Sequence, residues 1–100
     1  MSDHIYTLDE LRVLVRSIAA RYGVQRITLF GSYARGDASL NSDIDLRVDK
    51  GRIRGLLQLA GLQQDLEETL KTHVDLLTTD SLDEEFLKRI SREEIVLYEQ

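Results

Sequence analysis

Two short segments of the chain carry residue types that are able to bind phosphate and divalent cations. Gly31 and Ser32 are adjacent, and ten residues separate Ser32 from Asp43, which is followed by Ile44 and Asp45. A glycine lets the backbone approach a phosphate without a Cβ in the way, and a serine adds a hydroxyl and a backbone donor at a turn. Carboxylate oxygens are the hard ligands that magnesium prefers. The two segments therefore predict a site for phosphate and metal, which is what phosphoryl and nucleotidyl transfer require.

A third carboxylate completes this candidate site. Asp75 stands inside the otherwise apolar run Val74–Leu77, and Asp43 and Asp45 are two residues apart in an alternating segment. Side chains two apart on a strand emerge on the same face, about 7 Å apart at the backbone. If the two strands are parallel neighbours, their first residues align and Asp75 joins the other two. Three converging carboxylates repel one another unless cations lie between them, so we expect two Mg²⁺ ions bound by Asp43, Asp45 and Asp75.

Hydrophobic periodicity and turn residues predict the elements that position these side chains. The order is helix, strand, strand, helix, strand, helix. Capping boxes at Thr7–Glu10 and Ser81–Glu84 are expected to open the first and last helices. The expected ranges are a helix from 8 to 22, a strand at 26–30, a loop at 31–42 with at most one helical turn around 33–35, a strand at 43–48, a helix from 56 to about 72, a strand at 74–77 and a helix from 81. The tail at 95–98 fits either a short strand or a helix end.

These elements predict an α/β (α+β) fold with a small mixed β-sheet packed with about four helices. The short loop between the first two strands suits an antiparallel pair, which places the end of one strand beside the start of the next. The helix between the second and third strands suits a parallel crossover. This arrangement would bring Gly31 and Ser32 next to Asp43, with Asp75 alongside.

Length and charge narrow the classes of function. One hundred residues suit a single domain, 1–100, and leave no room for a separate substrate domain. The formal net charge of -5 argues against direct binding of nucleic acid. The N-terminal residues show no basic region leading into an apolar run, and no apolar run approaches the roughly 20 residues that a membrane span needs. We therefore expect a cytoplasmic protein with no membrane contact.

The segments Gly31–Asp37, Ser42–Leu46 and Val74–Leu77 together resemble the minimal nucleotidyltransferase branch of the DNA polymerase β superfamily, and the likeness covers almost the whole chain. The resemblance implies a polymerase-β-type fold in which Ser32 contacts the nucleotide phosphates and Gly31 and Arg35 shape the nucleotide pocket. It also implies that Asp43, Asp45 and Asp75 bind two magnesium ions, with Asp75 assisting the incoming nucleophile.

Single-domain members of that branch are antitoxins of type VII toxin–antitoxin systems. The resemblance implies that this chain is such an antitoxin, which transfers AMP from ATP onto a tyrosine of a partner HEPN-type ribonuclease toxin and forms a hetero-oligomer with it. The small size of the chain points the same way, because a bare catalytic core has little room for a small-acceptor pocket and suits a folded acceptor.

Other interpretations stay open from the sequence. The chain could neutralise its partner by binding alone, or transfer a nucleotide to a small molecule or an RNA end. The acidic surface disfavours RNA, and the missing second domain disfavours a small molecule. Arg35 is equally explained as a solvated loop residue, and for Asp37 the role of a turn former is favoured over that of a ligand. A solvated surface also explains the basic loop 50–54, and a structural role explains His4 and His73.

Overall fold

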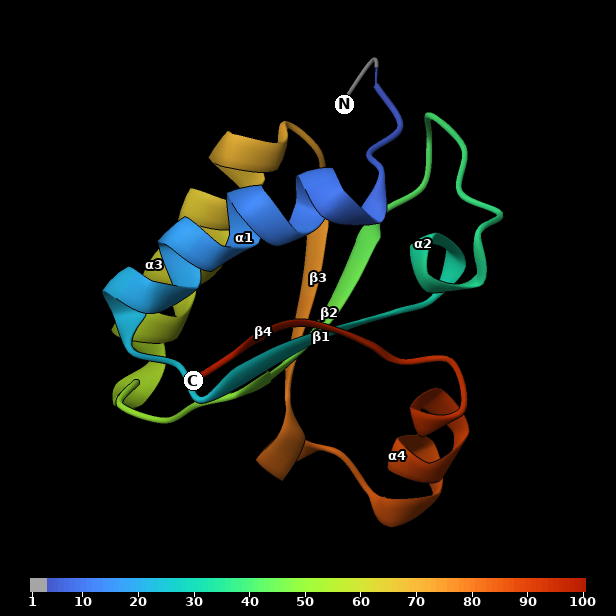
Figure 1. Cartoon of the computed structure of the whole chain (residues 1–100). Coiled ribbons are helices and arrows are strands. Elements are labelled where there is room, and N and C mark those ends of the chain that lie inside the picture. Colours follow the sequence, from blue (N-terminus) through green and yellow to red (C-terminus); the bar gives the residue numbers. More distant parts are fainter. Residues whose placement is uncertain (1–3) are drawn as a thin grey trace.

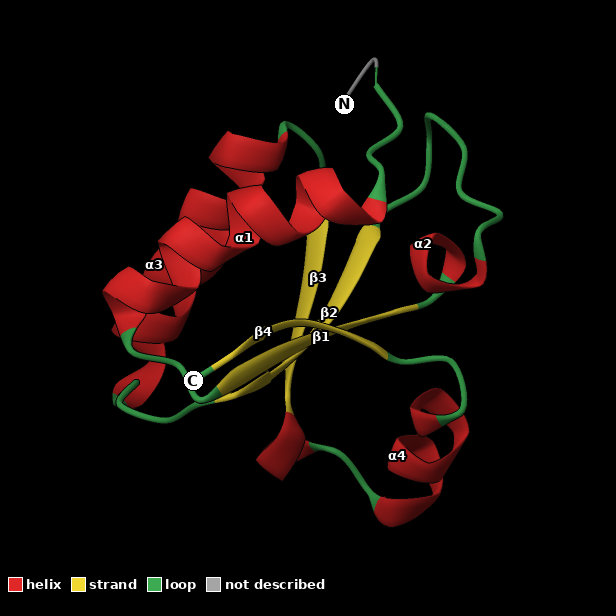
Figure 2. Ribbon diagram, viewed as in Figure 1, coloured by secondary structure: helices red, strands yellow, loops and turns green. Residues whose placement is uncertain are grey.

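The computed structural model describes residues 4–100, in which helices and strands alternate (Figures 1 and 2). In chain order the elements are α1 (Leu8–Tyr22), β1 (Arg26–Phe30), α2 (Ser32–Arg35), β2 (Ile44–Asp49), α3 (Gly55–Leu70), β3 (Val74–Thr78), a 3₁₀ helix (Thr79–Ser81), α4 (Glu84–Ser91) and β4 (Ile95–Glu99). Each helix and strand predicted from the sequence is present, with small shifts of its ends. The ambiguous tail is a strand, and the single helical turn predicted inside the loop is α2.

The four strands form one mixed sheet in the order β3-β2-β1-β4. β1 pairs antiparallel with β2 and with β4, and β2 pairs parallel with β3 across the α3 connection. Both predicted pairings are therefore confirmed, as is the predicted α/β class with a mixed sheet and four α-helices. The pairing sets Phe30, the last residue of β1, opposite Asp45, the second residue of β2.

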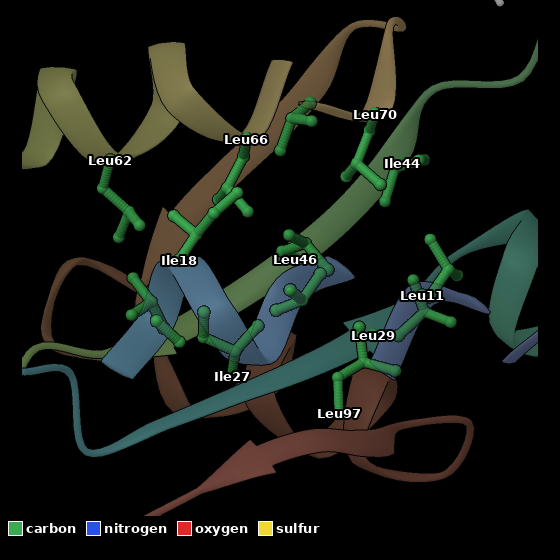
Figure 3. Close-up of a cluster of buried hydrophobic side chains, with 14 of the residues drawn as sticks. Leu11, Ile18, Ile27, Leu29, Ile44, Leu46, Leu62, Leu66, Leu70 and Leu97 are labelled. Atoms are coloured by element: carbon green, nitrogen blue, oxygen red, sulfur yellow. The ribbon is translucent and has the colours of Figure 1, made fainter. Parts of the chain in front are cut away.

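Helices α1 and α3 lie side by side over one face of the sheet (Figure 1). Between them and the strands lies the hydrophobic core, in which the apolar side chains of β1 and β2 alternate toward the helices (Figure 3). Fully buried members from each layer include Leu11, Ile18, Ile27, Leu29, Ile44, Leu46, Leu62, Leu66 and Leu70. This packing holds β1 and β2 in a fixed register. The assignment of residues 1–100 to one nucleotidyltransferase domain stays a prediction.

The ends of α1 follow from local sequence. The Thr7 hydroxyl accepts the Glu10 backbone N–H at 3.1 Å and the Glu10 carboxylate accepts the Thr7 N–H at 2.8 Å, which is the predicted capping box. At the other end Gly23 adopts a left-handed conformation, with φ of 69°, and closes the helix. Both ends of α1 are therefore determined by residues that lie within the helix or directly next to it.

The last helix, α4, lies across the sheet from α1 and α3 (Figure 1). Phe86 of α4 packs edge-on against Phe30 of β1, with ring centroids 6.2 Å apart. The predicted capping box from Ser81 is wrong: Asp83 caps α4 by accepting the Phe86 N–H at 2.8 Å, while the Ser81 hydroxyl donates to the Thr78 carbonyl. Asp83 is the cap because it directly precedes the first turn of α4, where a carboxylate caps as well as a serine hydroxyl does. Among residues 4–100, no helix is both long and apolar enough to cross a membrane.

Candidate active site

The turn that follows β1 passes directly against the carboxylate of Asp45. Gly31 has φ of 77°, a left-handed conformation that other residues adopt only at a cost. A Cβ built on Gly31 would overlap the Oδ2 atom of Asp45. Only glycine therefore lets the turn approach β2 this closely, which confirms the expected proximity of the Gly31–Ser32 segment to the acidic segment.

Ser32 begins α2 and is half-buried. Its backbone carbonyl accepts the N–H of Asp37 at 3.0 Å. Within the described residues its hydroxyl has no hydrogen-bond partner. A half-buried hydroxyl beside a glycine turn is available to a ligand, as a phosphate contact requires.

Asp45 and Asp75 are direct neighbours across the parallel pair β2–β3. Asp45 is half-buried, whereas Asp75 is exposed. Burial first, and then the negative charges of Asp75 and Asp43, together raise the pKa of Asp45 from 3.8 to about 6. The alignment of Asp75 with Asp45, which depended on parallel strands, is confirmed. Burial and the neighbouring carboxylates therefore both disfavour the charged form of Asp45.

Asp43 lies one residue before β2, so the predicted strand start is one residue too early. Its exposed carboxylate is 3.4 Å from Nδ1 of His73, whose Nε2 lies 3.9 Å from Glu67. Within residues 4–100, no three acidic, histidine or cysteine side chains converge into a ready-made metal site. Asp43 instead has His73 as its nearest charged or titratable partner, while Asp45 and Asp75 remain neighbours across the β2–β3 pair.

The residues present fit a magnesium ion. The donors on this face of β2 and β3 are hard carboxylate oxygens, and magnesium takes one or two of them together with water and phosphate oxygens. The raised pKa of Asp45, caused by burial and by Asp75, reflects charge that a bound cation would neutralise.

Arg35, the last residue of α2, is exposed and engaged by two carboxylates. Its Nε is 3.4 Å from Asp37 and its Nη1 is 3.1 Å from Glu93. These neighbours, Asp37 first, raise the pKa of the Arg35 guanidinium. Its charge also acts to lower the pKa of Asp45, although burial and the other carboxylates outweigh it. Arg35 therefore lies near the acidic cluster, as the pocket-shaping interpretation requires, and Asp37 pairs with it beyond forming a turn.

Two acidic residues between α4 and β4 belong to this region and were missed in the sequence. Glu93 accepts the backbone N–H of Gly31 at 2.7 Å. Glu94 forms a two-point ion pair with Arg47, with distances of 2.5 and 2.8 Å, and accepts the Thr28 hydroxyl at 2.7 Å. A pair of adjacent glutamates before an ambiguous tail has no periodicity, so no signal in the sequence marked them.

The Arg47–Glu94 pair is nearly enclosed, with 11% and 9% of the side chains exposed. Burial by itself would raise the pKa of Glu94, but the hydrogen bonds from Arg47 and then Thr28 outweigh burial and leave that pKa below its usual value. The pair anchors the segment after α4 to both β1 and β2. It therefore stiffens the sheet face that carries Asp45.

Several known proteins resemble this chain in both sequence and fold. Residues 14–100 match the family described as polymerase beta, nucleotidyltransferase. A predicted protein adenylyltransferase of Methanocaldococcus jannaschii is 38% identical, over 88% of this chain and 95% of that protein. The protein adenylyltransferase MntA of Thermococcus cleftensis is 37% identical, over 87% of this chain and 92% of that protein.

Two solved structures extend the likeness. The structure of a predicted minimal nucleotidyltransferase is 37% identical and superposes with a TM-score of 0.80, covering 94% of this chain and 98% of that one. A chain of a toxin–antitoxin crystal structure with AMP-PNP is 25% identical with a TM-score of 0.76, covering 89% of this chain and 73% of that one. This chain thus belongs to the polymerase β nucleotidyltransferase family and, within it, to the small protein adenylyltransferases.

Proposed function

We propose that this adenylyltransferase is the antitoxin of a toxin–antitoxin pair and transfers AMP from ATP onto a tyrosine of a HEPN-type ribonuclease toxin. The observation that carries the proposal is the meeting of the Gly31–Ser32 turn with Asp45 and Asp75 on adjacent strands. A phosphate-binding turn beside aligned carboxylates is the minimum that nucleotidyl transfer needs. The reaction belongs in the cytoplasm, where ATP and magnesium are supplied.

The residues divide the chemistry among them. Ser32 contacts the phosphates of ATP, Gly31 lets the turn approach them without a side chain in the way, and Arg35 balances part of their charge. Asp43, Asp45 and Asp75 hold magnesium, which supplies charge neutralisation and orients the phosphates for in-line transfer. Asp75 is exposed, so an incoming hydroxyl can reach it, and the resemblance to the family assigns it the role of accepting the proton of the attacking tyrosine.

A folded protein is the acceptor that the relatives support. They are named protein adenylyltransferases, and one related chain belongs to a toxin–antitoxin complex with an ATP analogue. A direct nucleic-acid acceptor is disfavoured because the net charge is -5. A protein acceptor implies that the two proteins form a complex at least while the transfer takes place.

The experiment is to incubate the purified partner toxin with this protein, ATP and Mg²⁺ and to measure the intact mass of the toxin. The expected result is an increase by one or more adenylate groups, which disappears when the target tyrosine is replaced by phenylalanine. The Asp43→Asn, Asp45→Asn double variant should abolish the increase, whereas Glu85→Gln, an exposed position on α4, should not.

The same variants separate catalysis from simple binding. If the double variant, expressed at the wild-type level, still rescues cells that express the toxin, occlusion of the toxin explains neutralisation and the catalytic proposal fails. Unmodified toxin after incubation with folded wild-type protein, ATP and Mg²⁺ would also contradict it.

A further inference from the structure

A single carboxylate oxygen joins the two ends of the short helix α2. Oε2 of Glu93 accepts the backbone N–H of Gly31, directly before α2, at 2.7 Å and lies 3.1 Å from Nη1 of Arg35, the last residue of α2. The Arg35 N–H in turn donates to the Gly31 carbonyl at 3.0 Å. Turn, helix and glutamate form one closed set of hydrogen bonds.

We propose that Glu93 is a positioning residue, which fixes the Gly31–Ser32 turn in the conformation that binds the phosphates of the nucleotide. The proposal rests on the function proposed above, because it takes the turn as the phosphate contact. Glu93 touches neither the nucleotide nor the metal in this role. It acts through the backbone of Gly31.

The pairing of the strands explains why Gly31 needs this partner. The β1–β4 ladder extends only to the pair Leu29 and Ile95, so β4 offers no backbone carbonyl opposite Gly31. A partly buried N–H without an acceptor is costly, and a left-handed glycine without a constraint explores many conformations. The Glu93 side chain supplies the missing acceptor just beyond the end of the ladder.

Glu93 is itself held in place on both sides. Its backbone N–H donates to the Ile90 carbonyl at the end of α4 at 3.0 Å. The next residue, Glu94, is anchored to β1 by Thr28 and to β2 by Arg47. The carboxylate therefore extends from a rigid segment, which is the condition for a supporting residue to preorganise a site.

A carboxylate at this place also has a cost. The charge of Glu93 contributes, after burial and the two aspartates, to the raised pKa of Asp45. A neutral acceptor would satisfy the Gly31 N–H without that repulsion. The charge is useful where it meets Arg35, which it holds against the turn.

Two neutral variants isolate the contact with Gly31. Glu93→Gln and Glu93→Met have the same charge and nearly the same length, but only glutamine keeps an oxygen that can accept the Gly31 N–H. The measurements are the dissociation constant for a fluorescent ATP analogue with Mg²⁺, and KM for ATP and kcat of AMP transfer. We expect the Met variant to have a dissociation constant and KM roughly five- to tenfold above those of the Gln variant, the value of one hydrogen bond.

The design separates positioning from a general loss of stability. Partial unfolding would lower kcat through the fraction of active protein, whereas a loosened turn raises KM and the dissociation constant. As a matched control, Glu85→Gln and Glu85→Met on the exposed side of α4 should not differ from each other. Equal dissociation constants and KM values for the two Glu93 variants would overturn the inference.

A third variant tests whether Glu93 works through Gly31 or only through Arg35. The difference between Glu93→Gln and Glu93→Met should persist in an Arg35→Ala background, and its disappearance there would refute the role assigned to the Gly31 N–H. Failure of the proposed function has a different signature: wild-type protein would then neither bind the ATP analogue with Mg²⁺ nor transfer AMP.

Discussion

Replacing Asp45 by asparagine should stabilise the metal-free protein while it abolishes AMP transfer. Asp45 is half-buried, and within the described residues its carboxylate accepts no hydrogen bond. Burial, Asp75 and Asp43 raise its pKa from 3.8 to about 6. Asparagine has the same shape without the charge, so the variant relieves the repulsion and leaves the packing intact.

The size of the effect follows from the difference between the two pKa values. A change from 3.8 to about 6 corresponds to roughly 3 kcal/mol between the protonated and ionised forms, because one unit equals about 1.4 kcal/mol. Solvent screening at this half-buried site reduces the expected gain to roughly 1–2 kcal/mol. For a domain of this length each kcal/mol changes Tm by roughly 4–8 °C.

The pH dependence has a definite sign. The folded protein holds the Asp45 proton more tightly than the unfolded chain, so the unfolded chain loses its proton first as pH rises. Stability is therefore highest below the unfolded pKa and falls until pH passes the folded value of about 6. The advantage of Asp45→Asn over wild type should be small at about pH 4 and complete at about pH 8.

The assay is urea unfolding of wild type and variant with EDTA at both pH values. Asp43→Asn is the matched control, because Asp43 is exposed and its loss also removes the contact with His73, so the gain should be much smaller than for Asp45→Asn. Added Mg²⁺ should raise the stability of wild type and have much less effect on Asp45→Asn. The reasoning is refuted if Asp45→Asn is no more stable than wild type at about pH 8, or if its advantage is the same at both pH values.

Three further perturbations test other parts of the structure. Gly31→Ala should abolish AMP transfer, measured by the mass of the toxin, because the added Cβ would overlap the Asp45 carboxylate. Gly36→Ala is the control, since Gly36 has a similar positive φ but open space around it. This control should lose roughly 1 kcal/mol of unfolding free energy in urea and keep the transfer activity. Arg47→Met should lower the free energy of unfolding by roughly 3–5 kcal/mol because it leaves the Glu94 charge buried alone, and adding Glu94→Gln should recover much of the loss. Asp83→Ala should cost roughly 1 kcal/mol in thermal unfolding, since it removes the cap of α4; no change would contradict the assigned cap.

Local patterns were sufficient to predict the fold and the main acidic residues. Thr7 and Glu10 lie three residues apart and cap the same helix, so nothing outside α1 was needed to predict its start. The alternation of β2 and the helix between β2 and β3 were enough to expect Asp45 and Asp75 side by side. These features depend on neighbours along the chain or on simple rules of strand connection.

The supporting contacts could not be predicted in the same way. Glu93 meets Gly31, and Glu94 meets Arg47, only because β4 returns along β1 after α4. Such contacts depend on three-dimensional packing and leave no periodic trace. The false capping box at Ser81 has a related cause, since Asp83 offered a second acceptor within the same few residues and only the structure shows which one faces the helix.

The contrast between two charges on one strand argues that Asp45 is reserved for a ligand. Arg47 lies two residues from Asp45 on the same face of β2, yet its guanidinium pairs with Glu94 at 2.5 and 2.8 Å. A sheet shaped by stability alone would use this nearby cation to balance the half-buried aspartate. Instead the chain neutralises Arg47 with a separate glutamate and leaves only Arg35, itself paired with Asp37 and Glu93, to offset the charge of Asp45. A cation from outside the chain, such as the proposed magnesium, is the partner that this arrangement lacks.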